Sequence, residues 1–148
     1  MKVAHPIESL SSSHRADVVQ QVLNVVSSVT MTPAEGASEV SQLVEDLGVE
    51  SIDLLDIFYQ LEDAFSVDFG GLPVFLDRAF LESEAGNIKD GRLTKAGWDR
   101  LAPYPYLRRP RLEADNVGAY LGSVGALVDL VMDRLLRGPA LDSADAHS

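Results

Sequence analysis

The stretch LVEDLGVESIDLLDIFYQLEDAF, residues 43–65, decides the fold. Apolar residues recur in it at intervals of three and four, which predicts an amphipathic helix over 51–65. The expected buried stripe is formed by Leu54, Ile57, Leu61 and Phe65, with Leu55 and Phe58 beside it. The polar residues expected on the opposite face are Asp53, Asp56, Gln60 and Asp63.

Ser51 begins this predicted helix, close to the N-cap position that favours serine. It is a single hydroxyl between acidic residues, and a serine nucleophile needs a neighbouring base. The three histidines fall in a predicted N-terminal arm, at its edge or in a C-terminal tail: His5, His14 and His147. The chain also has no GxSxG motif. We therefore expect no hydrolase and no catalytic residues.

Metal and phosphate sites are not expected either. The spacing of Asp46, Glu50 and Asp53 matches no EF-hand loop, and the chain contains no P-loop motif. There is no cysteine, so disulfides, thiolate nucleophiles and cysteine metal sites are excluded.

Further helices are predicted on both sides of 51–65. Valines at helical spacing predict a helix over 16–29, and Ser123 can cap a last helix over 124–136. Between them, 74–82 is predicted to be a short helix, and Thr94 can cap a helix from Lys95 to about Leu101. We read 83–93 as a loop with a turn at Asp90-Gly91, and 104–116 as irregular.

These elements indicate an all-α chain with one domain, as expected for 148 residues. We expect a flexible arm over 1–13, a single domain over 14–136 and a flexible tail over 137–148. Within the domain, about 70–121 is an insertion before the last helix. The insertion contains the one dense basic cluster, PYPYLRRPR (103–111). Its arginines are expected to stack on Tyr104 and Tyr106 or to contact an anionic group.

The charge is unevenly distributed. The net charge is −11, and residues 16–77 contain twelve acidic residues and no Lys or Arg. This surface excludes nucleic acid as an expected partner and suits basic proteins. The chain has no apolar run long enough to span a membrane and no signal-peptide pattern at its start. We accordingly expect a cytoplasmic monomer.

An acidic helix face is usually just solvated, but this one lacks the Lys or Arg partners that commonly support exposed helices. A serine at a helix N-terminus can instead be modified by another enzyme, which supplies the chemistry that the chain lacks. A phosphodiester attached there would be stabilised by the helix dipole and the free amides.

Residues 43–69 resemble the signature of acyl carrier proteins, an (E/D)DLG-x-DSL(D) motif followed by an amphipathic helix that ends in LE-x-x-F. The matching positions are Asp46-Leu47-Gly48, Ser51, Asp53, Leu61-Glu62 and Phe65. SVGALVDLVMDRL (123–135) is similar to the closing helix of that family, and 16–29 matches its opening helix. The resemblance covers about half of the chain. It implies an acyl-carrier-protein-like four-helix bundle with an inserted helical and loop segment.

By this resemblance, Ser51 would receive 4′-phosphopantetheine from coenzyme A through a phosphopantetheinyl transferase, with Glu50 and Asp53 beside it. The thiol of that group would carry acyl groups as thioesters for fatty acid, specialised lipid or polyketide synthesis. Acyl-loading, acyl-transferring or condensing enzymes with basic patches would dock on acidic positions, namely Asp53, Asp56, Glu62 and Asp63. The candidates to line an acyl pocket are Ile52, Leu55, Phe58 and Tyr59.

The chain departs from the family pattern at several positions. Glu50 replaces the usual Asp, Ile52 replaces the usual Leu, and Tyr59 stands where a smaller apolar residue is usual. The insertion has no firm family function. Two alternatives stay open: an adaptor with this fold that is never modified, and a carrier of aminoacyl (peptidyl) groups.

Overall fold

The computed structural model describes residues 12–33, 35–76 and 78–137. Most of the predicted arm, and all of the predicted tail beyond residue 137, lie outside them. The described chain is predominantly helical, as expected for an all-α protein. Its three long helices are α2 (Ser12–Thr30), α3 (Ser51–Phe65) and α8 (Val124–Arg137). The bounds predicted for α3 are confirmed, and α2 and α8 extend slightly beyond their predicted ranges.

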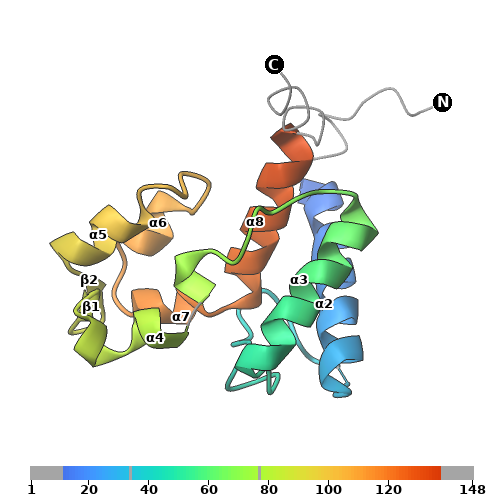
Figure 1. Cartoon of the computed structure of the whole chain (residues 1–148), viewed down its shortest axis with the longest axis horizontal. Helices are drawn as coiled ribbons and strands as arrows, with labels where there is room; N and C mark the ends of the chain where they lie inside the picture. The colour runs from blue at the N-terminus through green and yellow to red at the C-terminus, as the bar shows by residue number, and fades with distance from the viewer. Residues whose placement is uncertain (1–11, 34, 77, 138–148) are drawn as a thin grey trace.

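Helices α2, α3 and α8 pack side by side and form one lobe of the molecule (Figure 1). The buried residues follow the predicted spacing of three and four, and they are large and apolar. On α2 they are Val18, Val22, Leu23 and Val26; on α3 they are Leu54, Ile57, Phe58 and Leu61. Burying these side chains against one another supplies the main stabilisation of the bundle, since valine-rich helices have low intrinsic propensity.

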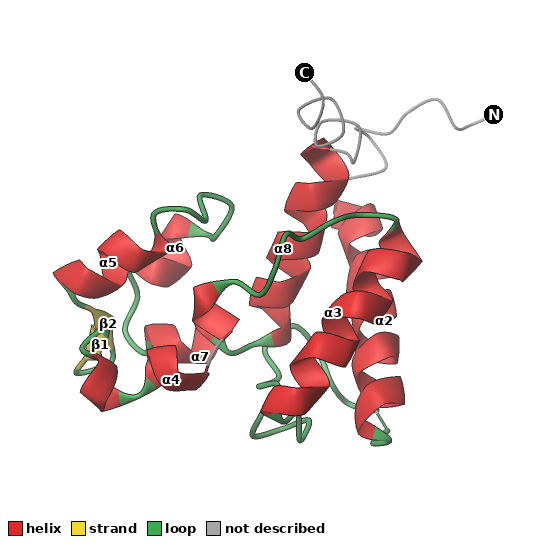
Figure 2. Ribbon diagram, viewed as in Figure 1, coloured by secondary structure: helices red, strands yellow, loops and turns green. Residues whose placement is uncertain are grey.

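The insertion forms the second lobe, which consists of short elements (Figure 2). In chain order these are η1 (Val74–Leu76), α4 (Arg78–Leu81), η2 (Ser83–Ala85), β1 (Ile88–Lys89), β2 (Arg92–Leu93), α5 (Lys95–Leu101), α6 (Arg109–Leu112) and α7 (Val117–Leu121). The predicted short helix over 74–82 is therefore split into η1 and α4. None of the helices among the described residues is both long enough and apolar enough to cross a membrane.

The predicted loop over 83–93 is in part a β-hairpin. Strands β1 and β2 pair antiparallel, with Ile88 opposite Leu93 and Lys89 opposite Arg92. The turn at Asp90-Gly91 is confirmed, and both of its residues have positive φ, which is the conformation that favours a two-residue hairpin. A loop was the wrong interpretation because two-residue strands are too short to produce an alternating pattern.

The helix caps predicted in the C-terminal half are present. The Thr94 hydroxyl accepts a hydrogen bond from the Gly97 amide at 3.1 Å, and α5 runs from Lys95 to Leu101 as expected. The Ser123 hydroxyl accepts from the Ala126 amide at 3.3 Å at the start of α8. By contrast, α6 and α7 lie in or beside the segment that we predicted to be irregular, because their four or five residues span too few turns for a periodic signal.

Candidate functional site

Ser51 is the first residue of α3, and its side chain is exposed. The N-cap is the preceding residue, Glu50, which has an extended backbone. The Asp53 carboxylate accepts a hydrogen bond from the Glu50 amide at 2.9 Å, which is one half of a capping box. The hydroxyl of Ser51 makes no hydrogen bond to another described residue. It is therefore free of the capping role that would ordinarily explain a serine at this place.

The loop before α3 is held firmly against the rest of the protein. The Asp46 carboxylate accepts from the Gln42 amide at 2.7 Å, and the Val49 amide donates to the Leu43 carbonyl at 2.9 Å. Gly48 adopts a positive φ of 72°, which lets the chain turn sharply into the helix. This local geometry explains the DLG sequence, since the Asp closes the turn, the Leu is buried and the Gly reverses the chain.

The same loop is bound to the junction of α7 and α8. The Leu43 amide donates to the Gly122 carbonyl at 2.9 Å, and the Val124 amide donates to the Ser41 carbonyl at 3.0 Å. The Gln42 side chain adds a hydrogen bond to the Ala119 carbonyl at 2.7 Å. These contacts fix the start of α3 relative to the end of the insertion.

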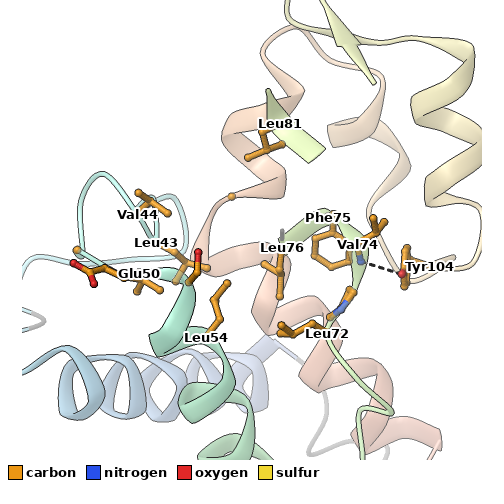
Figure 3. Close-up of a pocket in the computed structure, with 15 residues that line it drawn as sticks. Leu43, Val44, Glu50, Leu54, Leu72, Val74, Phe75, Leu76, Leu81 and Tyr104 are labelled. Atoms are coloured by element: carbon orange, nitrogen blue, oxygen red, sulfur yellow. Dashed lines mark hydrogen bonds between the residues drawn. The ribbon is translucent and has the colours of Figure 1, made fainter. Parts of the chain in front are cut away.

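A cavity of about 920 Å³ lies between the start of α3 and the insertion (Figure 3). Ser51 is part of its lining. One wall comes from the bundle side of the molecule and is made by Leu43, Val44, Val49 and Leu54. The other wall comes from the insertion and is made by Leu72, Val74, Phe75, Leu76, Leu81 and Tyr104. The lining is predominantly apolar, with Glu50, Ser51 and Tyr104 as its polar residues, which is typical of a site for a largely apolar ligand.

The insertion wall is ordered by its own contacts. The Val74 amide donates a hydrogen bond to the Tyr104 hydroxyl at 3.0 Å, as Figure 3 shows. The Phe75 ring packs edge-on against Tyr104, with ring centroids 5.3 Å apart. Phe75 and Leu76 are buried, whereas Leu72 at the rim is 41% exposed.

The four residues predicted to line an acyl pocket do not line this cavity. Phe58 is buried in the core, where its ring packs against Phe69. The other three are exposed on the outer side of α3: Ile52 at 76%, Tyr59 at 66% and Leu55 at 50%. The cavity instead uses Leu54, one position away from Leu55, because the bundle and the insertion cover that side of the helix.

The predicted docking acids take different positions. Asp56 and Asp63 are exposed, and no ion pair among the described residues involves an acid of α3. Glu62 has an internal role, because its carboxylate accepts from the Phe69 amide at 2.9 Å beyond the end of the helix. Asp53 is half-buried and closes the capping box. The uncompensated negative surface is therefore centred on Asp56 and Asp63.

Sequence reasoning missed a buried polar network that joins the two lobes. Asp129 on α8 is 5% exposed and pairs with Arg15 at 2.8 Å and with Arg108 at 3.4 Å. The buried Tyr120 hydroxyl donates to the same carboxylate and accepts from the Arg108 amide at 3.1 Å. Because these partners are far apart in the sequence, the only local signal of the network is an acidic residue, Asp129, within an apolar helix face.

Two pKa shifts follow from this network. The hydrogen bond from Arg15, 2.6 Å from Oε1 of Glu39, lowers the pKa of Glu39. Burial raises the pKa of Tyr120, and its hydrogen bond to Asp129 raises it further. Both shifts favour the protonation states that hold the network together at neutral pH.

The basic cluster of the insertion contacts the insertion itself and α8. The Arg109 guanidinium lies over Trp98, 4.8 Å from the ring centroid, and Arg111 lies over Tyr120 at 4.9 Å. Stacking on Tyr104 and Tyr106 was one of the two expectations for these arginines, and it is wrong, since those two rings pack against each other and against Phe75.

The arrangement presents an exposed hydroxyl, and no described residue forms a hydrogen bond with it. Among the described residues, no group of three or more acidic or histidine side chains is placed to bind a metal ion. Comparisons with protein-family models, curated proteins and solved structures found no match for this chain.

Proposed function

We propose that this chain is an acyl carrier protein that is modified with 4′-phosphopantetheine at Ser51. The observation that carries this proposal is the state of the Ser51 hydroxyl. It is exposed at the start of a 15-residue helix, it takes no part in capping, and it borders a large apolar cavity. In the proposed bundle, α2, α3 and α8 are the long helices and α7 is the short fourth one.

The residues around Ser51 suit the proposed group. A phosphodiester on its oxygen would lie at the positive end of the α3 dipole, where amide groups are free to bind anions. The bound group would supply a thiol, which forms thioesters with acyl groups. The transferase would supply the base for attachment, so Ser51 would need no base from this chain.

The outer face of α3 suits docking by basic enzymes. The exposed apolar residues Ile52, Leu55 and Tyr59 are spaced by three and four, and Asp56 and Asp63 lie near them on the same helix. An apolar stripe beside unpaired acids offers both contact area and charge complementarity. We therefore reassign these three residues from pocket lining to partner contact.

The decisive experiment is intact-protein mass after co-expression with a broad phosphopantetheinyl transferase. We expect wild type to gain one phosphopantetheine group and Ser51→Ala to gain none. Ser28→Ala is the matched control, since Ser28 is an exposed serine within α2, and it should be modified like wild type. If several such transferases leave wild type unmodified, the carrier function is refuted and the adaptor function takes its place.

A further inference from the structure

The cavity between the lobes has one wall that is built by the insertion, and the proposed carrier function does not by itself require such a wall. The insertion provides more than half of its apolar lining residues, so a bundle without 70–121 would lack this site. We propose that the insertion is a cargo-binding element, and that the cavity takes the hydrocarbon chain of a long, uncharged acyl group. This inference rests on the proposed attachment at Ser51.

The lining selects the chemistry of the cargo. Most of the described side chains that line the cavity are aliphatic or aromatic, including Leu54, Leu72 and Phe75. No Lys, Arg or His is among the described residues that line it, so none of these residues would balance the carboxylate of a dicarboxylic acyl group. Among the described lining residues the one charged side chain is that of Glu50, and it would attract an amine at the edge occupied by Ser51. Deeper inside the cavity, the ammonium group of an aminoacyl cargo would therefore meet no described carboxylate that balances its charge.

Size supports a long chain. A volume of about 920 Å³ is near the upper end of the range for small-molecule sites, roughly 300 to 1,000 Å³. An acetyl group would fill little of it, whereas every added methylene would remove more apolar surface from water.

The insertion wall is anchored, so the cavity does not depend on a loose flap. The 72–76 segment is fixed by the hydrogen bond between Val74 and Tyr104, and the following part of the insertion is fixed by Arg108 on Asp129. Binding in a site that already exists avoids the entropic cost of ordering its wall.

The test is the unfolding temperature of the holo-protein loaded with acetyl, octanoyl or dodecanoyl groups, with loading verified by mass. We expect a rise of about 5 °C or more from acetyl to dodecanoyl, because a chain bound only by the folded state stabilises it. Leu72→Trp, at the rim of the cavity, should abolish most of this dependence. The matched control is Leu136→Trp, since Leu136 on α8 is also an exposed leucine but lies outside the cavity and not on α3, and it should keep the dependence.

Equal unfolding temperatures for the three acyl groups in wild type would overturn the inference, as would an unchanged chain-length dependence in Leu72→Trp. A parallel titration of the unmodified protein with uncharged dodecan-1-ol separates this failure from failure of the carrier function. If Ser51 is never loaded but dodecan-1-ol stabilises wild type and not Leu72→Trp, the carrier function fails and the cavity's ligand class stands. Absence of both effects refutes the two proposals together.

Discussion

Asp129 is the residue whose replacement should most clearly separate the two lobes. It is 5% exposed and is held by Arg15, Arg108 and Tyr120. Breaking a buried ion pair by removing one partner typically costs about 3 to 5 kcal/mol. We expect less for Asp129→Asn, because Arg15 retains Glu39 and Arg108 is 49% exposed and can be hydrated. The expected loss is about 2 kcal/mol of unfolding free energy.

Urea unfolding measures this loss. With a denaturant dependence of about 2 kcal/mol per molar urea, the midpoint should fall by about 1 M. Trp98 is the one tryptophan and lies on α5, so its fluorescence reports on the insertion, while circular dichroism reports on all of the helices. The two transitions should coincide in wild type and separate in Asp129→Asn, with the insertion unfolding first.

Two further variants control this experiment. Tyr120→Phe removes only the hydroxyl and should cost about 1 kcal/mol. Asp17→Asn changes an exposed acid on α2 and should stay within about 0.5 kcal/mol of wild type. A midpoint for Asp129→Asn that equals that of Asp17→Asn would refute the structural role of the network.

Three other perturbations test separate parts of the structure. Because the pKa of Glu39 is lowered in the folded state, its stabilising contribution is present above its ordinary value of 4.5 and is lost as the pH falls through its folded value. Acid titration of Glu39→Gln should therefore show a weaker loss of stability than wild type. Gly97→Ala should destabilise by about 2 kcal/mol or more in urea unfolding, since its Cβ would lie 2.2 Å from the Asn87 carbonyl oxygen. Gly118→Ala meets only ordinary contacts and should be neutral or gain up to about 1 kcal/mol. The double variant with Asp56→Lys and Asp63→Lys should slow modification by a transferase about tenfold in kcat/KM at low salt, with unfolding nearly unchanged.

Each of these three expectations has a contrary result. An unchanged acid profile in Glu39→Gln would mean that the ion pair with Arg15 does not persist in solution. Equal stabilities of the two glycine variants would contradict the close approach of Gly97 to the β-hairpin. Unfolding of the double lysine variant, with modification unchanged in the remaining folded protein, would show that the two acids are structural.

Local patterns predicted the long helices and several caps well. The bounds of α3 and α5 followed from apolar spacing and from capping chemistry, both of which act over a few residues. The spacing placed Leu54 in the buried stripe, which is confirmed, but it also placed Leu55 beside that stripe, and Leu55 is 50% exposed because no other segment packs on its side of the helix. Asp129 illustrates the same limit, since its partners Arg15 and Tyr120 come from distant parts of the chain.

The cavity also had no signature in the sequence. One wall comes from residues near 43–54 and the other from residues near 72–81. The distance between the two walls depends on the hydrogen bond between the Leu43 amide and the Gly122 carbonyl. The resemblance to acyl carrier proteins gave the position of Ser51 but suggested pocket residues from the bundle alone. Two of the residues that the resemblance suggested for the pocket, Ile52 and Tyr59, are exposed in this structure.

The shared carboxylate of Asp129 has an evolutionary consequence. Its partners Tyr120 and Arg108 come with the insertion, whereas Arg15 and Glu39 belong to the bundle side. A descendant that deleted the insertion would keep an acid within an apolar helix face with only Arg15 beside it. Loss of the segment and loss of the charge at position 129 should therefore occur together. Homologous chains of both lengths would record this as covariation between the insertion and a single position of the last helix.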